Sequence, residues 1–301
     1  MDVPFTRLVR FKTSEGQTHY GEAGSNWQKD LKGQTVKTFQ GTDPWDPDFS
    51  LSGEEAVISE VLCPLPSVPV TLGIGLNYRK HAEEAGFTIP TFPVVFTKYL
   101  GKQASWEPQP SCTLTHQSPD TLAGPFEDIP IHPEARELDY EGELSIVIGK
   151  DVKNLTEKDD PLDYVLGYTV GNDVSSRYWQ NAARSGAQHG PAKSFDKFGP
   201  IGPAIASPKA VKNPEALKLQ TWVNGDLRQD GSTDDLIFGI KEIIRFLSQG
   251  KTVRKGTVIM TGTPSGVAAF MKPAQFLKDG DVVEIEVENI GKISNKMVFE
   301  K

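Results

Sequence analysis

Short strand-like segments dominate this 301-residue sequence, and they do not alternate regularly with helices. A parallel sheet covered by helices needs such alternation, because each parallel connection requires a long crossover. The best helix is predicted over residues 233–250, where apolar side chains recur at three- and four-residue spacing before Gly250. The sequence therefore predicts an α+β fold rather than a doubly wound α/β fold.

A proline-rich segment, residues 63–70 (CPLPSVPV), separates two parts of the chain. Proline restricts such a segment to an edge or a linker. We predict a small strand-rich N-terminal domain over residues 1–66, with a short helix starting within 52–59, and a catalytic domain over 67–301. Residues 101–121 have no consistent period and contain three prolines, which predicts a long loop.

Composition and charge exclude several classes of protein. The chain has 32 lysines and arginines against 40 aspartates and glutamates, so its net charge of −8 offers no basic surface for nucleic acid. Cys63 and Cys112 form no Cys-x-x-Cys pair for zinc or disulfide exchange. No apolar run reaches the roughly 18 residues of a membrane span, and residues 1–12 lack a secretory signal core. We expect an intracellular protein, cytoplasmic or mitochondrial, that binds no membrane.

The segment 138–149, LDYEGELSIVIG, carries two acids at alternate positions. Alternate side chains of a strand share one face, so Glu141 and Glu143 point the same way. A third acid, Asp173, follows a predicted strand that would pair near the first. Three carboxylates without histidine or cysteine favour Mg²⁺, Mn²⁺ or Ca²⁺ over zinc. The alternative is a solvated strand face with two ordinary acids, and an Asp173 that caps a helix.

Two predicted helices carry further candidates for the site. His81 and Glu84 are spaced i, i+3 on a short helix, so the carboxylate can orient the imidazole for acid–base catalysis. Such pairs are also common on ordinary helix surfaces. We predict that Asp173 opens a second helix on which Arg177 and Gln180 face the same cavity. Arg177 would clamp a substrate carboxylate, or would simply be a surface arginine paired with an acid.

Two loops add a lysine and a threonine. Lys193 lies in GPAKSFDKFGP, from which it could face a developing enolate, although most lysines are only solvated. Thr263 lies with Thr261 and Ser265 on the glycine-bearing turn MTGTPSGV, which could offer hydroxyl and N–H groups to a carboxylate. The turn lacks the ending of a phosphate-binding loop. The remaining histidines, His189 among them, show no ligand spacing and are expected to be structural or at the surface.

Together these motifs resemble the fumarylacetoacetate hydrolase family over about residues 66–301. Six motifs occur in the family's order: GIGLNYRKHAEE, LDYEGELSIVIGK, GYTVGNDVSSRYWQ, AKSFDKFGPIGP, VNGD and IMTGTPSGV. The run TGTPSGVAAFMKPAQFLKDGDVVEIEVENIG is most similar to the branch called fumarylacetoacetate hydrolase domain-containing protein 2. The resemblance implies a mixed β-roll, usually a homodimer. Residues 101–121 depart from that branch as an inserted loop.

The resemblance also implies roles for the residues singled out above. The ligands of a divalent metal, commonly Mg²⁺ or Mn²⁺, with Ca²⁺ as a substitute in crystals, would be Glu141, Glu143 and Asp173. The catalytic residues would be His81, Glu84 and Lys193. The substrate contacts would be Arg177, Gln180 and Thr263.

Family substrates are small 2-oxo acids with a second carbonyl, which can chelate the metal and form a metal-bound enolate. Proton transfer at C3 then gives keto–enol tautomerisation, attack by water breaks a carbon–carbon bond, and loss of CO₂ gives decarboxylation. We expect a metal-dependent oxaloacetate tautomerase. An acylpyruvate or fumarylpyruvate-type hydrolase and an oxaloacetate decarboxylase are the alternatives, and a non-catalytic metal-binding protein is a more remote one.

Overall fold

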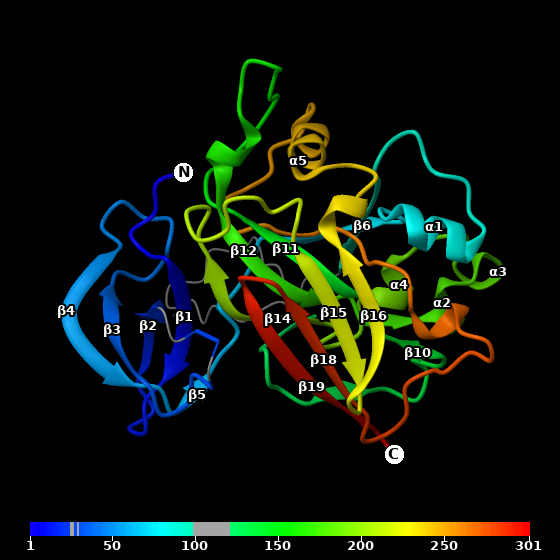
Figure 1. Cartoon of the computed structure of the whole chain (residues 1–301), viewed down its shortest axis with the longest axis horizontal. Coiled ribbons are helices and arrows are strands. Elements are labelled where there is room, and N and C mark those ends of the chain that lie inside the picture. The colour runs from blue at the N-terminus through cyan, green and yellow to red at the C-terminus, as the bar shows by residue number, and fades with distance from the viewer. Residues whose placement is uncertain (25–26, 29, 99–120) are drawn as a thin grey trace, which may run out of the picture.

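Two β-sheets form most of the computed structural model, and short helices lie at one end (Figure 1). The structure describes residues 1–24, 27–28, 30–98 and 121–301. The predicted inserted loop, 101–121, lies outside these ranges except for Thr121. Because strands dominate and the helices are few and isolated, the predicted α+β class is confirmed.

The larger sheet has 12 strands and is mixed. In pairing order it contains β4 (Ser50–Val57), β3 (Thr35–Gln40), β2 (Thr18–Glu22), β1 (Arg7–Lys12), β14 (Gly199–Ala206), β12 (Val165–Asn172), β11 (Gly142–Ile148), β17 (Val258–Met260), β6 (Thr71–Gly75) and β7 (Val94–Lys98), with β5 (Glu60–Val61) on β1 and β8 (Leu122–Ala123) on β14. The pairs β17–β6 and β14–β8 are parallel. The helix predicted to start within 52–59 is wrong, because β4 pairs with β3 there.

The second sheet has five strands and covers the middle of the first. Its order is β16 (Asp226–Ser232), β15 (Lys218–Val223), β18 (Val282–Val287), β19 (Gly291–Phe299) and β9 (Ile129–Ile131). Leu144 and Ile146 of β11 belong to the same buried apolar cluster as Leu219 of β15 and Ile285 of β18. The main core therefore lies between the two sheets, where burial of these side chains stabilises both. A separate short pair joins β10 (Leu138–Asp139) to β13 (Ser175–Ser176).

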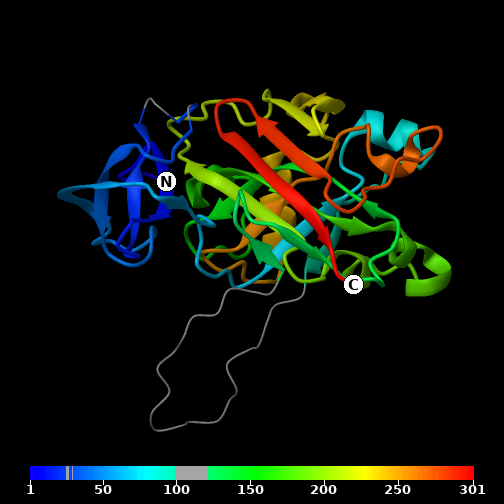
Figure 2. The same ribbon diagram turned by 90° about the horizontal axis from the view of Figure 1, so that it is seen from below.

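The helices are short and lie mainly beside the ends of the central strands. They are α1 (Arg79–Ala85), α2 (Arg177–Gln180), α3 (Ala182–Ser185), α4 (Gly190–Lys193) and α5 (Ile240–Ser248), with 3₁₀ turns η2 (Pro161–Tyr164), η3 (Thr233–Asp235) and η4 (Ala268–Phe270). Figure 2 shows α1 at the opposite end of the molecule from the N-terminal strands. Among the described residues, no helix is both long and apolar enough to cross a membrane.

The helix predicted over 233–250 is interrupted, and α5 forms only its second half. The backbone N–H of Ile237 donates to the carbonyl of Asn77, and that of Phe238 donates to the Asn77 side chain, both at 2.8 Å. These hydrogen bonds hold the preceding segment out of the helix, which begins after Gly239.

The strands of the predicted N-terminal domain continue the larger sheet. Strand β1 pairs with β14, and its Leu8 lies opposite Ile205. Phe49 also shares an apolar cluster with Val147 and Ile201. The division at residue 66 stays a prediction.

Candidate metal centre

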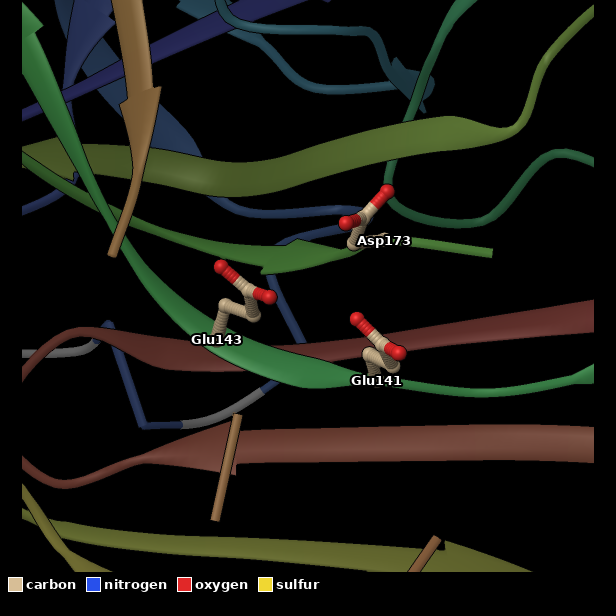
Figure 3. A group of neighbouring side chains, drawn as sticks. All are labelled: Glu141, Glu143 and Asp173. Carbon is tan, nitrogen blue, oxygen red and sulfur yellow. The ribbon is translucent and has the colours of Figure 1, made fainter. Parts of the chain in front are cut away.

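Strands β11 and β12 bring the three predicted acids together. Their antiparallel register pairs Glu143 with Gly171, and just beyond it the N–H of Asp173 donates to the carbonyl of Glu141 at 2.9 Å. Residues that face each other across an antiparallel pair project to the same side. One oxygen from each carboxylate accordingly lies within 4.8 Å of the others (Figure 3).

All three carboxylates are buried. The exposed fractions are 6% for Glu141, 2% for Glu143 and 0% for Asp173. A backbone N–H reaches Glu143 from the predicted glycine-bearing turn, where Gly262 donates to its Oε2 at 2.7 Å. Gly262 has φ +104°, and a Cβ there would lie 2.7 Å from Cβ of Asn77. Only glycine therefore fits at this position without strain.

Two buried lysines contact the carboxylates. Lys193, at the end of α4, donates from Nζ to Glu141 at 2.7 Å and to Asp173 at 2.6 Å. Lys98, at the end of β7 and 1% exposed, lies 2.5 Å from the other Asp173 oxygen. Its Nζ also donates to the carbonyls of Lys193 and Phe198 at 2.8 Å each. Lys98 was not predicted as a site residue from the sequence, although it lies on the same face of β7 as the buried Phe96.

The positive charges do not compensate the three acids equally. Burial would raise the pKa of Glu141, but Lys193 and Arg177 outweigh burial and hold this pKa well below its usual range. Burial raises the pKa of Glu143 well above its usual range, and the charges of Asp173 and Glu141 raise it further. Glu143 is therefore the buried carboxylate that most needs an additional cation.

The donor set fits a hard divalent cation. It consists of carboxylate oxygens alone, which Mg²⁺, Mn²⁺ and Ca²⁺ prefer over the nitrogen and sulfur ligands of zinc. Within the described ranges, no other group of three or more histidine, cysteine or acidic side chains is close enough to hold an ion. The residues that would hold the metal are Glu141, Glu143 and Asp173.

Helix α2 directs Arg177 and Gln180, the predicted substrate contacts, toward the same acids. Arg177 donates from Nε to Asp139 at 2.8 Å and from Nη1 to the Gln180 side-chain oxygen at 2.6 Å. The same Nη1 lies 2.7 Å from Glu141. Within the described part of the chain, the buried Nη2 has no hydrogen-bond partner. Arg177 therefore keeps Nη2 as a donor for a ligand while it pairs with two acids, Asp139 and Glu141.

Asp173 does not open a helix, so that prediction is wrong. The residues that follow it form β13, which pairs with β10, and α2 begins only at Arg177. Asp139 of β10 is fully buried and accepts from the backbone of Ala268 and Ala269 at 2.8 and 3.0 Å. Asp139 was also not predicted as a site residue, although Asp139, Glu141 and Glu143 occupy every second position of the segment.

Helix α1 carries the predicted catalytic pair. Nδ1 of His81 lies 3.3 Å from the carboxylate of Glu84, and both oxygens of that carboxylate accept from the N–H of Gly266 at 3.1 Å. The imidazole packs edge-on against Phe270 at 5.7 Å and is 7% exposed. A positive charge on His81 lowers the pKa of Glu141, so the imidazole lies within electrostatic reach of the acids.

The hydroxyl of Thr263 already has two hydrogen-bond partners in the protein. It donates to the carbonyl of Gly142 at 3.0 Å and accepts from the Gln229 side chain at 2.7 Å. Donation from this hydroxyl to a substrate carboxylate would replace its hydrogen bond to the carbonyl of Gly142. The structure thus brings all nine predicted side chains to one region, on or beside β11 and β12, on helices α1, α2 and α4, and on the turn after β17.

Sequence comparisons place the chain among known proteins. A family model described as fumarylacetoacetate (FAA) hydrolase C-terminal matches residues 71–298. Oxaloacetate tautomerase Fahd2a, mitochondrial, of Rattus norvegicus is 36% identical over 237 residues, which are 79% of this chain and 69% of the relative. Oxaloacetate tautomerase YisK of Bacillus subtilis (strain 168) is 40% identical over 237 residues, 78% of this chain and 71% of the relative.

Solved structures share the whole fold. A 2-hydroxyhepta-2,4-diene-1,7-dioate isomerase from Mycobacterium marinum has a TM-score of 0.76 and 28% identity, over 98% of this chain and 99% of that one. A fumarylacetoacetate hydrolase from psychrophilic Exiguobacterium antarcticum has a TM-score of 0.72 and 29% identity, over the same shares. The family model spans more than half of the chain and agrees with the motifs and the fold, so this chain belongs to the fumarylacetoacetate hydrolase family of enzymes.

Proposed function

We propose that the chain is a divalent-metal-dependent oxaloacetate keto–enol tautomerase. The observation that carries the proposal is the buried acid group of β11 and β12, faced by Lys193 and by an unpaired donor of Arg177. An oxygen-only cation site beside two fixed positive charges suits a small dicarboxylic 2-oxo acid. Two relatives named oxaloacetate tautomerase, 36% and 40% identical, support the choice of reaction.

The proposed metal is Mg²⁺ or Mn²⁺, held by Glu141, Glu143 and Asp173. When bound, the ion supplies Lewis-acid polarisation of the substrate's carboxylate and keto oxygens. The protein contributes the preorganised ligand set: the β11–β12 register fixes Asp173 across from Glu141, and Gly262 fixes one oxygen of Glu143.

Arg177, Gln180 and Lys193 would bind and orient the substrate. The free Nη2 of Arg177 can donate to a substrate carboxylate, and Asp139 keeps the guanidinium in place. Burial opposes the charge of Lys193, but Asp173 and Glu141 outweigh it and raise the pKa of this lysine. Lys193 is therefore an ammonium at neutral pH and can stabilise negative charge that develops on the keto oxygen.

The His81–Glu84 pair would move the proton. Glu84 is anchored by the backbone of Gly266, so it holds the imidazole in one orientation. Ketonisation takes one proton from the enol hydroxyl and delivers one to C3, and no carbon–carbon bond breaks. A single imidazole within reach of both atoms can serve as base and then as acid.

One observation favours an acylpyruvate-type hydrolase as a second candidate. Phe87, whose side chain is 58% exposed, packs edge-on against Phe270 at 6.2 Å, and Phe270 in turn contacts His81. These two phenyl rings beside His81 and Glu84 would suit an apolar acyl group of the substrate better than a second carboxylate.

The test is the rate of enol-oxaloacetate loss, followed by ultraviolet absorbance with MgCl₂ and with EDTA. We expect His81→Ala to lower kcat by roughly 10²- to 10⁴-fold, the usual contribution of a general acid–base, while Mg²⁺ still raises its Tm. Glu143→Gln should lose both turnover and the Mg²⁺ shift. Glu60→Gln is the matched control, because Glu60 is 58% exposed and forms a surface ion pair with Lys12 at 3.4 Å. Wild-type turnover in Glu143→Gln would contradict the proposal.

We also propose that the enzyme is an intracellular homodimer. Support for the compartment comes from the rat relative, whose name places that protein in mitochondria. Sedimentation equilibrium of the purified chain tests the dimer, and a single species of 33.0 kDa would contradict it.

A further inference from the structure

His189 lies beside the site but has no part in the proposed reaction. It immediately precedes α4, which ends at Lys193. Its ring lies 5.2 Å from the ring of Phe96, and Nζ of Lys193 lies 4.9 Å from the centroid of that same phenyl ring. His189 and a residue of the site thus share one aromatic neighbour.

The hydrogen-bond chain around Gln180 fixes the state of this histidine. Arginine has donors only, so the side-chain oxygen of Gln180 must face Nη1 of Arg177, 2.6 Å away. The amide nitrogen of Gln180 must then face His189, whose Nδ1 is 3.2 Å away. An amide NH₂ can only donate, so Nδ1 must accept. The ring is therefore neutral and carries its proton on Nε2.

The surrounding charges agree with a neutral ring. Burial is the largest influence and lowers the pKa of His189, and the positive charges of Lys193 and Arg177 lower it further. Glu141 and Asp173 act in the opposite sense without reversing the shift.

We propose that His189 is a positioning residue, whose unprotonated Nδ1 fixes the Gln180 carboxamide and, through it, the orientation of Arg177 toward a substrate carboxylate. This inference rests on the proposed function, because it concerns the binding of a carboxylate at the same site. A protonated ring would present a donor to the donor of Gln180. The amide cannot turn over to relieve this clash, because its NH₂ group would then face Nη1 of Arg177, which is also a donor. Substrate binding should therefore weaken as the pH falls and the ring gains its second proton.

Two variants of His189 distinguish the role of its hydrogen-bond acceptor, Nδ1, from the packing of its ring against Phe96. His189→Phe keeps a ring against Phe96 and removes the acceptor, and His189→Asn places an oxygen near the position of Nδ1 without a titrating group. We expect His189→Phe to raise the KM for oxaloacetate about 2- to 12-fold, the worth of one net hydrogen bond, with kcat within about twofold. His189→Asn should restore KM and abolish its rise at acid pH. Unchanged KM in His189→Phe, or equal impairment in both variants, would overturn the proposal.

A second readout does not depend on turnover. In Mg²⁺-loaded protein labelled with ¹⁵N-histidine, the signals of His189 are those that vanish in His189→Phe. We expect an unprotonated Nδ1, a proton on Nε2 and titration below the ordinary histidine range. A proton on Nδ1 at neutral pH would overturn the proposal even in an active enzyme. If NMR shows the expected tautomer but the protein does not turn over oxaloacetate, the assignment of His189 stands and the proposed function is refuted.

Discussion

Replacing Lys98 with methionine should strongly destabilise the protein. The lysine is 1% exposed, its Nζ lies 2.5 Å from Asp173, and it donates to the carbonyls of Lys193 and Phe198. Methionine keeps most of the side-chain volume but removes the charge and the donors. One oxygen of Asp173 and the carbonyl of Lys193 then lose a donor, and the carbonyl of Phe198 keeps the N–H of Val174 at 3.1 Å.

The expected loss follows from burial. Removing one partner of a buried ion pair costs about 3–5 kcal/mol when the other charge stays buried; here Asp173 keeps Lys193 as a partner, while the carbonyls of Lys193 and Phe198 also lose a donor. Each kcal/mol lowers Tm by about 2–4 °C in a chain of 150–250 residues and by less in a longer one, so Tm of this 301-residue chain should fall by at most roughly 20 °C. Mg²⁺ should recover part of this loss, since a cation bound by Asp173 replaces the missing positive charge.

The assay is urea unfolding and differential scanning calorimetry, each with EDTA and with saturating Mg²⁺. The matched control is Lys197→Met, because Lys197 pairs with Glu127 at 2.9 Å while both side chains are about two-fifths exposed. An exposed pair of this kind contributes about 0–1 kcal/mol. If Lys98→Met lowers the free energy of unfolding by no more than Lys197→Met does, the buried ion pair between Lys98 and Asp173 does not stabilise the protein as argued.

Three further changes test other parts of the site. The pKa of Glu143 is raised well above 4.5, so the metal-free protein should become less stable than Glu143→Gln as the pH rises through that pKa. Mg²⁺ binding should displace the proton of Glu143. Isothermal titration calorimetry would show this release as a binding enthalpy that depends on the buffer. Gly262→Ala, at φ +104° and 2.7 Å from Asn77, should weaken Mg²⁺ binding and cost about 1–3 kcal/mol of stability; an unaltered Kd would argue against this role of the turn. Asp139→Asn should raise the KM for oxaloacetate about tenfold, the effect of one charge-assisted hydrogen bond of about 1.5 kcal/mol to Arg177, and a change confined to kcat would contradict that assignment.

The convergence of the acids was predictable because it depends on a local rule. Strand alternation places Glu141 and Glu143 on one face, and a hydrophobic strand ending at Asn172 predicts that Asp173 follows a neighbouring strand. The same rule applied to 94–98 places Lys98 on the buried face of its strand beside Phe96. A lone lysine is nevertheless expected to be solvated, since burial of its charge is costly without a partner.

The errors arose where distant residues override local pattern. The helix predicted over 233–250 is shortened by hydrogen bonds that the N–H groups of Ile237 and Phe238 donate to Asn77, which is 161 residues from Phe238 in the sequence. The helix predicted to open at Asp173 is replaced by the pairing of β13 with β10. Neither partner can be identified from hydrophobic periodicity, which reports only the local face of an element.

The most direct test of the central claim is a proton NMR time course of the Mg²⁺-loaded enzyme with enol-oxaloacetate and, separately, with acetylpyruvate. A parallel run in D₂O reports exchange at C3, and EDTA provides the metal-free control. The account predicts Mg²⁺-dependent conversion of the enol to the keto form with exchange at C3 and without pyruvate. Acetate and pyruvate from acetylpyruvate, or pyruvate from oxaloacetate, would contradict a tautomerase and establish a hydrolase or a decarboxylase instead.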